Sequence, residues 1–198
     1  MKLDEERDAP ATSLIVTVVA RDRPGIVRSI AERAKRHDAN WAASRMTSLH
    51  DQFAGIVHLQ VPPDNVEALI VALRSLEPTG VSLTIARNDA SPVSPGRRIV
   101  RLELTGPDRP GIVNELSSRL ADRGVSIEDL HTQILDGNGD SRHVFRVNAL
   151  LHVPNELRED ELRAALDALA SESKTDIALG ERTPGATPVQ APFQNAPR

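Results

Sequence analysis

The hexapeptide Asp22-Arg23-Pro24-Gly25-Ile26-Val27 decides the fold, because it recurs 86 residues later as Asp108-Arg109-Pro110-Gly111-Ile112-Val113. The same offset places Asn40 on Ser126, so the repeat extends beyond the motif. Repeats found in this way define the architecture, and two copies are too few for a solenoid. The sequence therefore indicates a tandem duplication of one small domain.

The duplication divides the chain of 198 residues into two domains and three connecting or terminal segments. The last 16 residues contain four of the 14 prolines and little that a core would bury. We expect a flexible N-terminal tail at 1–12, a first domain at 13–88, a linker at 89–96, a second domain at 97–182 and a disordered Pro-rich tail at 183–198.

Each copy begins with a strand followed by a helix. In the second copy Val100, Leu102 and Leu104 alternate with polar residues, which predicts a strand with one buried face. The stretch 14–20 is apolar nearly throughout, which predicts a central strand covered on both faces. Pro24 and its repeat suit the first turn of the helix that follows.

A hairpin, a second helix and a last strand complete each copy. Asp136-Gly137-Asn138-Gly139 is a strong turn signal for the second hairpin, and Pro62-Pro63-Asp64 opens the second helix of the first copy. The order βαββαβ predicts an α+β, ferredoxin-like domain, with a four-stranded antiparallel sheet and two helices on one face. The expected strands of these hairpins and domain ends span 40–49, 53–61 and 81–86, and 126–135, 142–153 and 176–179.

Composition excludes several classes of function. There is no Cys, so disulfides and thiolate catalysis are excluded. The net charge of −4 and 2% aromatic residues speak against direct nucleic-acid binding. No apolar run approaches 18 residues, so we expect no membrane span and a cytoplasmic location. We also expect no catalytic residues, no cofactor and no metal site, since none of the six His has a His at the equivalent position of the other copy.

The junction between the first strand and the first helix is the best candidate for a ligand site. A helix start presents unpaired N–H groups and the positive end of the helix dipole. Gly25 and Gly111 have no Cβ, so a carboxylate could approach these amides closely, while Asp22 and Asp108 offer acceptors for an ammonium group. The alternative is a stiff, well-capped turn without a ligand.

Two βαββαβ units that each carry Asp-Arg-Pro-Gly-Ile-Val after the first strand resemble a tandem pair of ACT domains. That family consists of small regulatory modules that bind amino acids and adjust the activity of an attached or associated protein. A pair with little else attached is most similar to the glycine cleavage system regulatory (transcriptional repressor) proteins. The resemblance covers residues 13 to about 181.

The resemblance implies a set of ligand-binding residues in each copy. In the first copy, the loop and the amides after the proline contact the ligand, and Asn40 is expected to close on the Asp22–Gly25 loop. In the second copy the shorter Ser126 takes the place of Asn40 and makes fewer hydrogen bonds. The implied residues are Asp22, Arg23, Gly25, Ile26 and Asn40, together with Asp108, Gly111, Ile112 and Ser126.

The expected function is therefore that of a non-catalytic regulator that binds a small amino acid and modulates a protein partner, either a transcription regulator or an enzyme. Two alternatives stay open: a structural protein–protein interaction module without a ligand, and a regulatory subunit of an enzyme of amino-acid metabolism. A homodimer also stays open. The sequence names neither the amino acid nor the partner.

We predict that the purified protein alone does not bind double-stranded DNA at sub-micromolar concentration, because it lacks both a basic excess and a helix-turn-helix. An electrophoretic mobility shift over a range of salt concentrations checks this. A retarded band that weakens with added salt would contradict the prediction.

Overall fold

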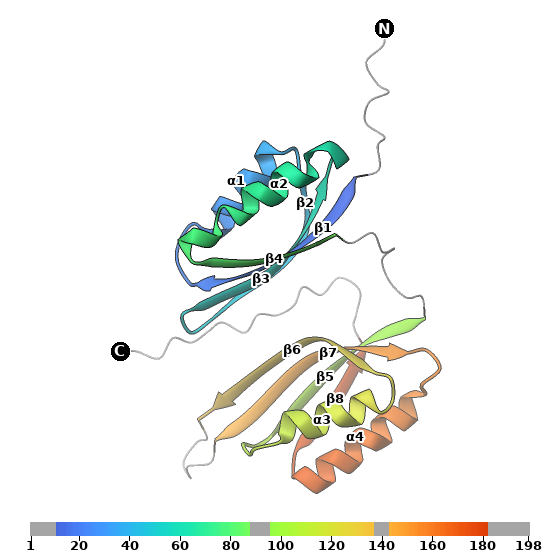
Figure 1. Ribbon diagram of the computed structural model, residues 1–198. Coiled ribbons are helices and arrows are strands. Elements are labelled where there is room, and N and C mark those ends of the chain that lie inside the picture. The colour runs from blue at the N-terminus through green and yellow to red at the C-terminus, as the bar shows by residue number, and fades with distance from the viewer. Residues whose placement is uncertain (1–10, 88–95, 137–142, 182–198) are drawn as a thin grey trace. The chain divides into compact units, whose positions relative to one another are not determined.

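The computed structural model describes residues 11–87, 96–136 and 143–181 (Figure 1). The chain separates into two units, Met1–Pro92 and Val93–Arg198, and each is described by itself. The expectations for residues 1–10 of the N-terminal tail, for the C-terminal tail, for nearly all of the linker and for the turn at 137–140 lie outside the described residues and stay predictions, whereas Thr12, expected in the tail, begins the first strand.

Domain 1 has the order βαββαβ, with a sheet in the strand order β2-β3-β1-β4. Every neighbouring pair of strands is antiparallel. Short 3-10 turns, η1 (Pro63–Asn65) and η2 (Glu77–Thr79), flank the second helix. The elements are β1 (Thr12–Arg21), α1 (Ile26–Arg36), β2 (Asn40–Leu49), β3 (Gln52–Val61), α2 (Val66–Arg74) and β4 (Val81–Arg87).

Domain 2 repeats this arrangement, with the strand order β6-β7-β5-β8 and antiparallel pairing throughout. The predicted fold class, two α+β units of the ferredoxin-like type, is confirmed. The elements are β5 (Arg97–Pro107), α3 (Ile112–Ala121), β6 (Ser126–Leu135), β7 (Val144–Pro154), α4 (Glu159–Ser173) and β8 (Asp176–Glu181).

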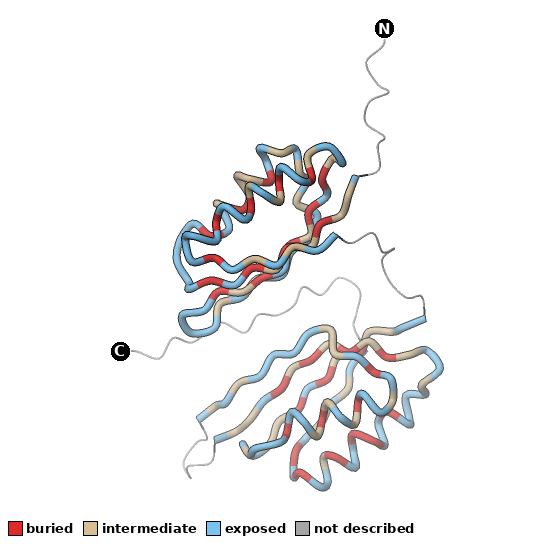
Figure 2. Tube along the Cα trace, viewed as in Figure 1, coloured by how far each residue is buried: buried red, intermediate tan, exposed pale blue. Residues whose placement is uncertain are grey.

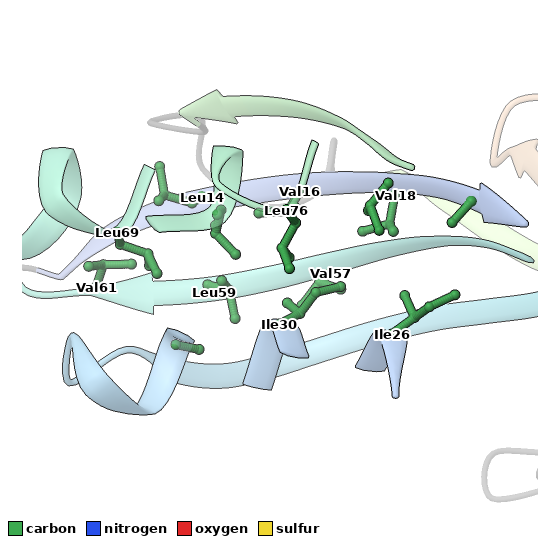
Figure 3. Packing of buried hydrophobic residues seen from close by; sticks show 14 of the residues in the cluster. Leu14, Val16, Val18, Ile26, Ile30, Val57, Leu59, Val61, Leu69 and Leu76 are labelled. Atoms are coloured by element: carbon green, nitrogen blue, oxygen red, sulfur yellow. The ribbon is translucent and has the colours of Figure 1, made fainter. Parts of the chain in front are cut away.

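Each domain has its own core between the helices and one face of the sheet (Figure 2). In domain 1 the side chains of Leu14, Val16 and Val18 alternate toward the helices and meet Ile30 of α1 and Leu69 of α2 (Figure 3). All five are fully buried. Burial of such a side chain contributes about 1.5–3 kcal/mol, so these contacts hold both helices on the sheet.

The expectation that β1 is covered on both faces is wrong within the domain. Leu14, Val16 and Val18 point to the helices, whereas Val19 on the other face is 44% exposed. Both helices lie on one side of the sheet (Figure 1). The apolar character of this strand therefore comes from β-branched residues that suit a pleated sheet as well as from burial.

The position expected for the two prolines also differs. Helix α1 begins at Ile26 with Gly25 as its N-cap, so Pro24 precedes the helix and does not occupy its first turn. Gly111 is the N-cap of α3 in the same way. Both glycines adopt a left-handed conformation, with φ of 97° and 96°, and this delays the start of each helix by two residues beyond the proline.

The backbone of Gly106 in β5 packs closely against Thr175, the residue before β8, and leaves no room for a side chain. A Cβ built on Gly106 would lie 2.9 Å from Cβ and 3.1 Å from Cα of Thr175. Thr175 is only 6% exposed, so it has little room to move. Gly180 on the neighbouring strand β8 has no atom within 4 Å of its Cβ position.

We predict that Gly106→Ala destabilises the protein by about 1–3 kcal/mol, because the added methyl group overpacks the contact with Thr175. The matched control Gly180→Ala should change stability by less than about 0.5 kcal/mol. Guanidinium unfolding followed by circular dichroism measures both. Equal stabilities of the two variants would contradict the prediction.

Candidate functional site

The strand–helix junction of each domain leaves the start of its helix open. The N-cap residues of α1 and α3 are glycines, which have no side chain with which to cap the helix. The first intrahelical bond of α1 runs from the Ser29 N–H to the Gly25 carbonyl at 2.9 Å, and Glu115 bonds to Gly111 in the same way in α3. The N–H groups before Ser29 therefore point out of the helix start, at the positive end of its dipole.

In each domain a residue of the hairpin segment between the second and third strands, Asp51 or His143, is bonded to the loop before the helix. The Asp22 N–H donates to the Asp51 carbonyl at 2.7 Å, and the Asp108 N–H donates to the His143 carbonyl at 3.0 Å. These two backbone N–H groups therefore already have carbonyl partners within the domain. The Asp22 and Asp108 residues themselves are exposed, so their carboxylates are accessible to a ligand.

The arginine after each aspartate joins the loop to the segment before the last strand, but with different partners. Arg23 donates through Nη2 to the Thr79 carbonyl at 3.1 Å and to Thr79 Oγ1 at 3.3 Å. Arg109 donates through Nη1 and Nη2 to the two carboxylate oxygens of Glu115, at 2.8 and 2.5 Å, and through Nη2 to Ser173 Oγ at 2.8 Å. Among the described residues, the loop arginine therefore has an acidic partner in domain 2 and neutral partners in domain 1.

The Arg109–Glu115 pair changes the titration of both groups. The hydrogen bond from Arg109, together with its charge, lowers the pKa of the Glu115 carboxyl, and the Ser173 hydroxyl adds to this effect. The same hydrogen bond raises the pKa of Arg109. The pair is therefore ionised at neutral pH, although about a third of each side chain is accessible to solvent.

The expectation that Asn40 closes on its own Asp22–Gly25 loop is wrong. Asn40 pairs with Gln60 of β3, and Gln60 pairs with Ser13 at the beginning of β1. The loop follows Arg21 at the other end of β1. At about 3.3 Å per residue, this places the two groups roughly 26 Å apart.

Ser126 is separated from its own loop in the same way. It pairs with His152, which pairs with Ile99 near the beginning of β5, whereas the loop with Asp108 follows the end of β5. Its hydroxyl accepts a hydrogen bond from Arg97 at 2.8 Å. The structure therefore brings together, in each domain, only the loop residues and the two amides after the proline: Asp22, Arg23, Gly25 and Ile26, and Asp108, Arg109, Gly111 and Ile112.

The remaining features do not form an alternative site. His58 bonds to Ser13 Oγ at 2.6 Å, and His152 lies 3.0 Å from Glu128. Among the described residues, no three His, Asp or Glu side chains converge as metal ligands would. A cavity of about 30 Å³ beside Arg98 and Glu159 has room for one or two water molecules. In the part of the chain that the structure describes, no helix is long and apolar enough to cross a membrane.

Three residues of this site were not expected from the sequence. Thr79 and Ser173 accept hydrogen bonds from the loop arginines, and Glu115 pairs with Arg109. The signal for Glu115 was present, because the offset of 86 places it on Ser29 and so marks a difference in charge at the first turn of the helix.

Comparison with known proteins identifies this architecture. The family model of the ACT domain matches residues 12–82 and again 98–179. The chain therefore belongs to the ACT domain family, as a tandem pair. Among curated proteins, no sequence matches the chain.

Two solved structures match both domains. A protein of unknown function from Galdieria sulphuraria is 33% identical, with a TM-score of 0.79, over 87% of this chain and 99% of that one. A protein provisionally described as a glycine cleavage system transcriptional repressor is 18% identical, with a TM-score of 0.64, over 87% of this chain and 98% of that one. At 18% identity the second structure shows a shared fold alone.

We predict that Glu115→Gln lowers the melting temperature at pH 7 and that the difference from the wild type narrows as the pH falls to about 3. The lowered pKa means that the ionised Glu115 stabilises the fold above its unfolded-state pKa, and this stabilisation is lost as the pH falls through the folded-state pKa. Calorimetry at several pH values measures it, with the exposed Glu156→Gln as control. A difference that is independent of pH would contradict the prediction.

Proposed function

We propose that this protein is a non-catalytic regulator that binds a small amino acid at a strand–loop–helix junction and modulates a protein partner. The observation that carries the proposal is the open start of α1. Gly25 has a φ of 97°, its Cβ position has no atom within 4 Å from described residues beyond its two chain neighbours and the backbone of its own helix, and as the N-cap it has no side chain with which to cap the helix. The junction therefore offers unpaired N–H groups beside free space.

An amino acid has two charged groups, and the junction matches both. Its carboxylate would accept hydrogen bonds from the N–H groups at the start of α1, among them that of Ile26. Its ammonium group would donate to the exposed carboxylate of Asp22. Hydrogen bonds to charged groups are worth roughly 1.5–3 kcal/mol each, so a few of them suffice for a ligand of this size.

Arg23 supplies further positive charge at the same junction. Its guanidinium is held over the loop by the Thr79 carbonyl, a neutral partner, so its charge is not neutralised by that contact. A carboxylate that enters the junction would be attracted to it. The corresponding residues Asp108, Gly111 and Ile112 form the candidate junction of domain 2.

Asn40 and Ser126 have a different role in this proposal. Because each lies at the far end of its own sheet, either can contact a ligand at a loop only where another copy of the domain supplies that loop. We therefore assign the principal contacts to the loop residues. The effect of Asn40→Ala on binding measures whether such a second copy takes part.

Regulation follows if the bound and free forms differ in affinity for a protein partner. Coupling between two sites is typically worth 1–3 kcal/mol. The structural neighbour described as a glycine cleavage system transcriptional repressor favours a role in transcription, and the ACT family supports either kind of partner. An interaction module that binds no ligand is the alternative, and calorimetry distinguishes the two.

We predict that one of the twenty standard amino acids raises the melting temperature of the full chain and that Gly25→Val weakens its binding at least tenfold. The branched side chain would fill the space in front of the helix start, and the positive φ would add strain. Isothermal titration calorimetry measures the affinity of both proteins.

The control is Gly96→Val, which imposes a similar strain at φ +108° where the nearest atom to the Cβ position is 4.0 Å away. It should leave the affinity within about threefold of the wild type, a change of less than roughly 0.7 kcal/mol. The proposal fails if no amino acid binds, or if Gly25→Val and Gly96→Val bind equally well.

A further inference from the structure

The two helix starts differ in what lies beside them. In domain 1 no atom lies within 4 Å of the Cβ position of Gly25, and the first turn of α1 has no acidic residue. In domain 2 the carboxylate oxygen Oε1 of Glu115 lies 3.7 Å from the Cβ position of Gly111. The offset of 86 places Ser29 at the position of Glu115, so domain 1 has a short, neutral side chain there.

A connected set of hydrogen bonds holds the Glu115 carboxylate at this position. Both of its oxygens accept from Arg109, in a bidentate arrangement that fixes the plane of the carboxylate. Ser173 Oγ donates to Oε2 at 3.2 Å and accepts from Arg109 at 2.8 Å. Ser173 is only 7% exposed, and α4 fixes its position, so the carboxylate has a well-defined partner on the other helix.

The charges of the two junctions differ as a result. In domain 2 the guanidinium of Arg109 is neutralised by Glu115, and the start of α3 already has a carboxylate beside it. A second carboxylate there would be repelled by the first, and both hydrogens of Arg109 Nη2 already have partners in Glu115 and Ser173. In domain 1 Arg23 donates to Thr79, which has no charge. The lowered pKa of Glu115 keeps its charge in place at neutral pH.

We infer that Glu115 is an internal carboxylate that excludes amino-acid carboxylates from the junction of domain 2, so that the chain binds a single amino acid, in domain 1. This inference rests on the proposed function, since it assumes that these junctions bind amino acids. It assigns to Glu115 the role of a specificity-determining residue that distinguishes the two copies.

The test is a titration of the 15N-labelled full chain with each of the twenty standard amino acids, followed through the amide signals of both loops. The expected result is a shift at Gly25 and Ile26 with no shift at Gly111 and Ile112, and a calorimetric stoichiometry of one. Glu115→Ser introduces the residue type of domain 1, so it should add shifts at Gly111 and raise the stoichiometry to two. The control Glu159→Ser removes the same charge at the start of α4 and should leave the stoichiometry at one.

The reverse substitution tests the same inference without disturbing domain 2. Ser29→Glu places a carboxylate in the first turn of α1, at the position that Glu115 has in α3. This variant should bind the amino acid at Gly25 at least tenfold more weakly. Ser29→Gln adds a side chain of nearly the same size without the charge and should weaken binding less than threefold. This pair separates repulsion from crowding.

The outcomes distinguish the two proposals. Shifts at both loops of the wild type, or a Glu115→Ser variant that still binds one amino acid, would each overturn the role of Glu115 and leave the proposed function standing. Shifts at Gly111 alone would overturn both proposals, because the proposed site is the start of α1. No shift at either loop with any amino acid would overturn the proposed function, and the inference with it. Equal weakening by Ser29→Glu and Ser29→Gln would overturn the electrostatic argument.

Discussion

The left-handed conformation of one glycine in each domain is the constraint on which the rest depends. At Gly25 and Gly111, with φ of 97° and 96°, the chain leaves the central strand and turns into the helix that covers it. A residue with a Cβ would be strained there, and a side-chain cap would satisfy the first N–H groups of the helix. Because the cap is a glycine, the fold has both a sharp reversal and an open helix start. Ile26 and Ile30 then face the sheet and bury the helix against it.

The two copies share this backbone conformation and differ in the partners of the loop arginine, which include a carboxylate in domain 2 and are neutral in domain 1. In domain 2, Arg109, Glu115 and Ser173 form a connected set of hydrogen bonds. In domain 1, Arg23 donates to the neutral Thr79, and the first turn of α1 has no acidic residue. One difference in charge between the two helix starts therefore comes from a single position, Ser29 against Glu115.

The fold was predictable from the sequence to a large extent, and the site only in part. The repeated hexapeptide and the alternation in β5 fix the element order, because strand and helix periods are properties of local sequence.

The helix start was placed two residues too early, since Pro24 suits a first turn but the conformation of Gly25 decides where the helix begins. The pairing of Asn40 with the loop failed for a topological reason: β2 and β1 both pair antiparallel to β3, so they run parallel and the start of one lies far from the end of the other. The contact of Arg109 with Ser173 joins residues 64 positions apart, and no local pattern reports it.

An internal ion pair and a ligand stabilise their domains in different ways. The Arg109–Glu115 pair contributes to domain 2 at all times, whereas a ligand stabilises domain 1 only by an amount that grows with the logarithm of its concentration above the dissociation constant. Under the proposed function, the stability of domain 1 reports the amino-acid concentration while that of domain 2 does not. A ligand can shift a conformational equilibrium only by its differential affinity for the two states. Under the proposed function, exchange of the neutral partner Thr79 of Arg23 for the carboxylate of the ligand is one rearrangement that would make the bound form differ from the free form.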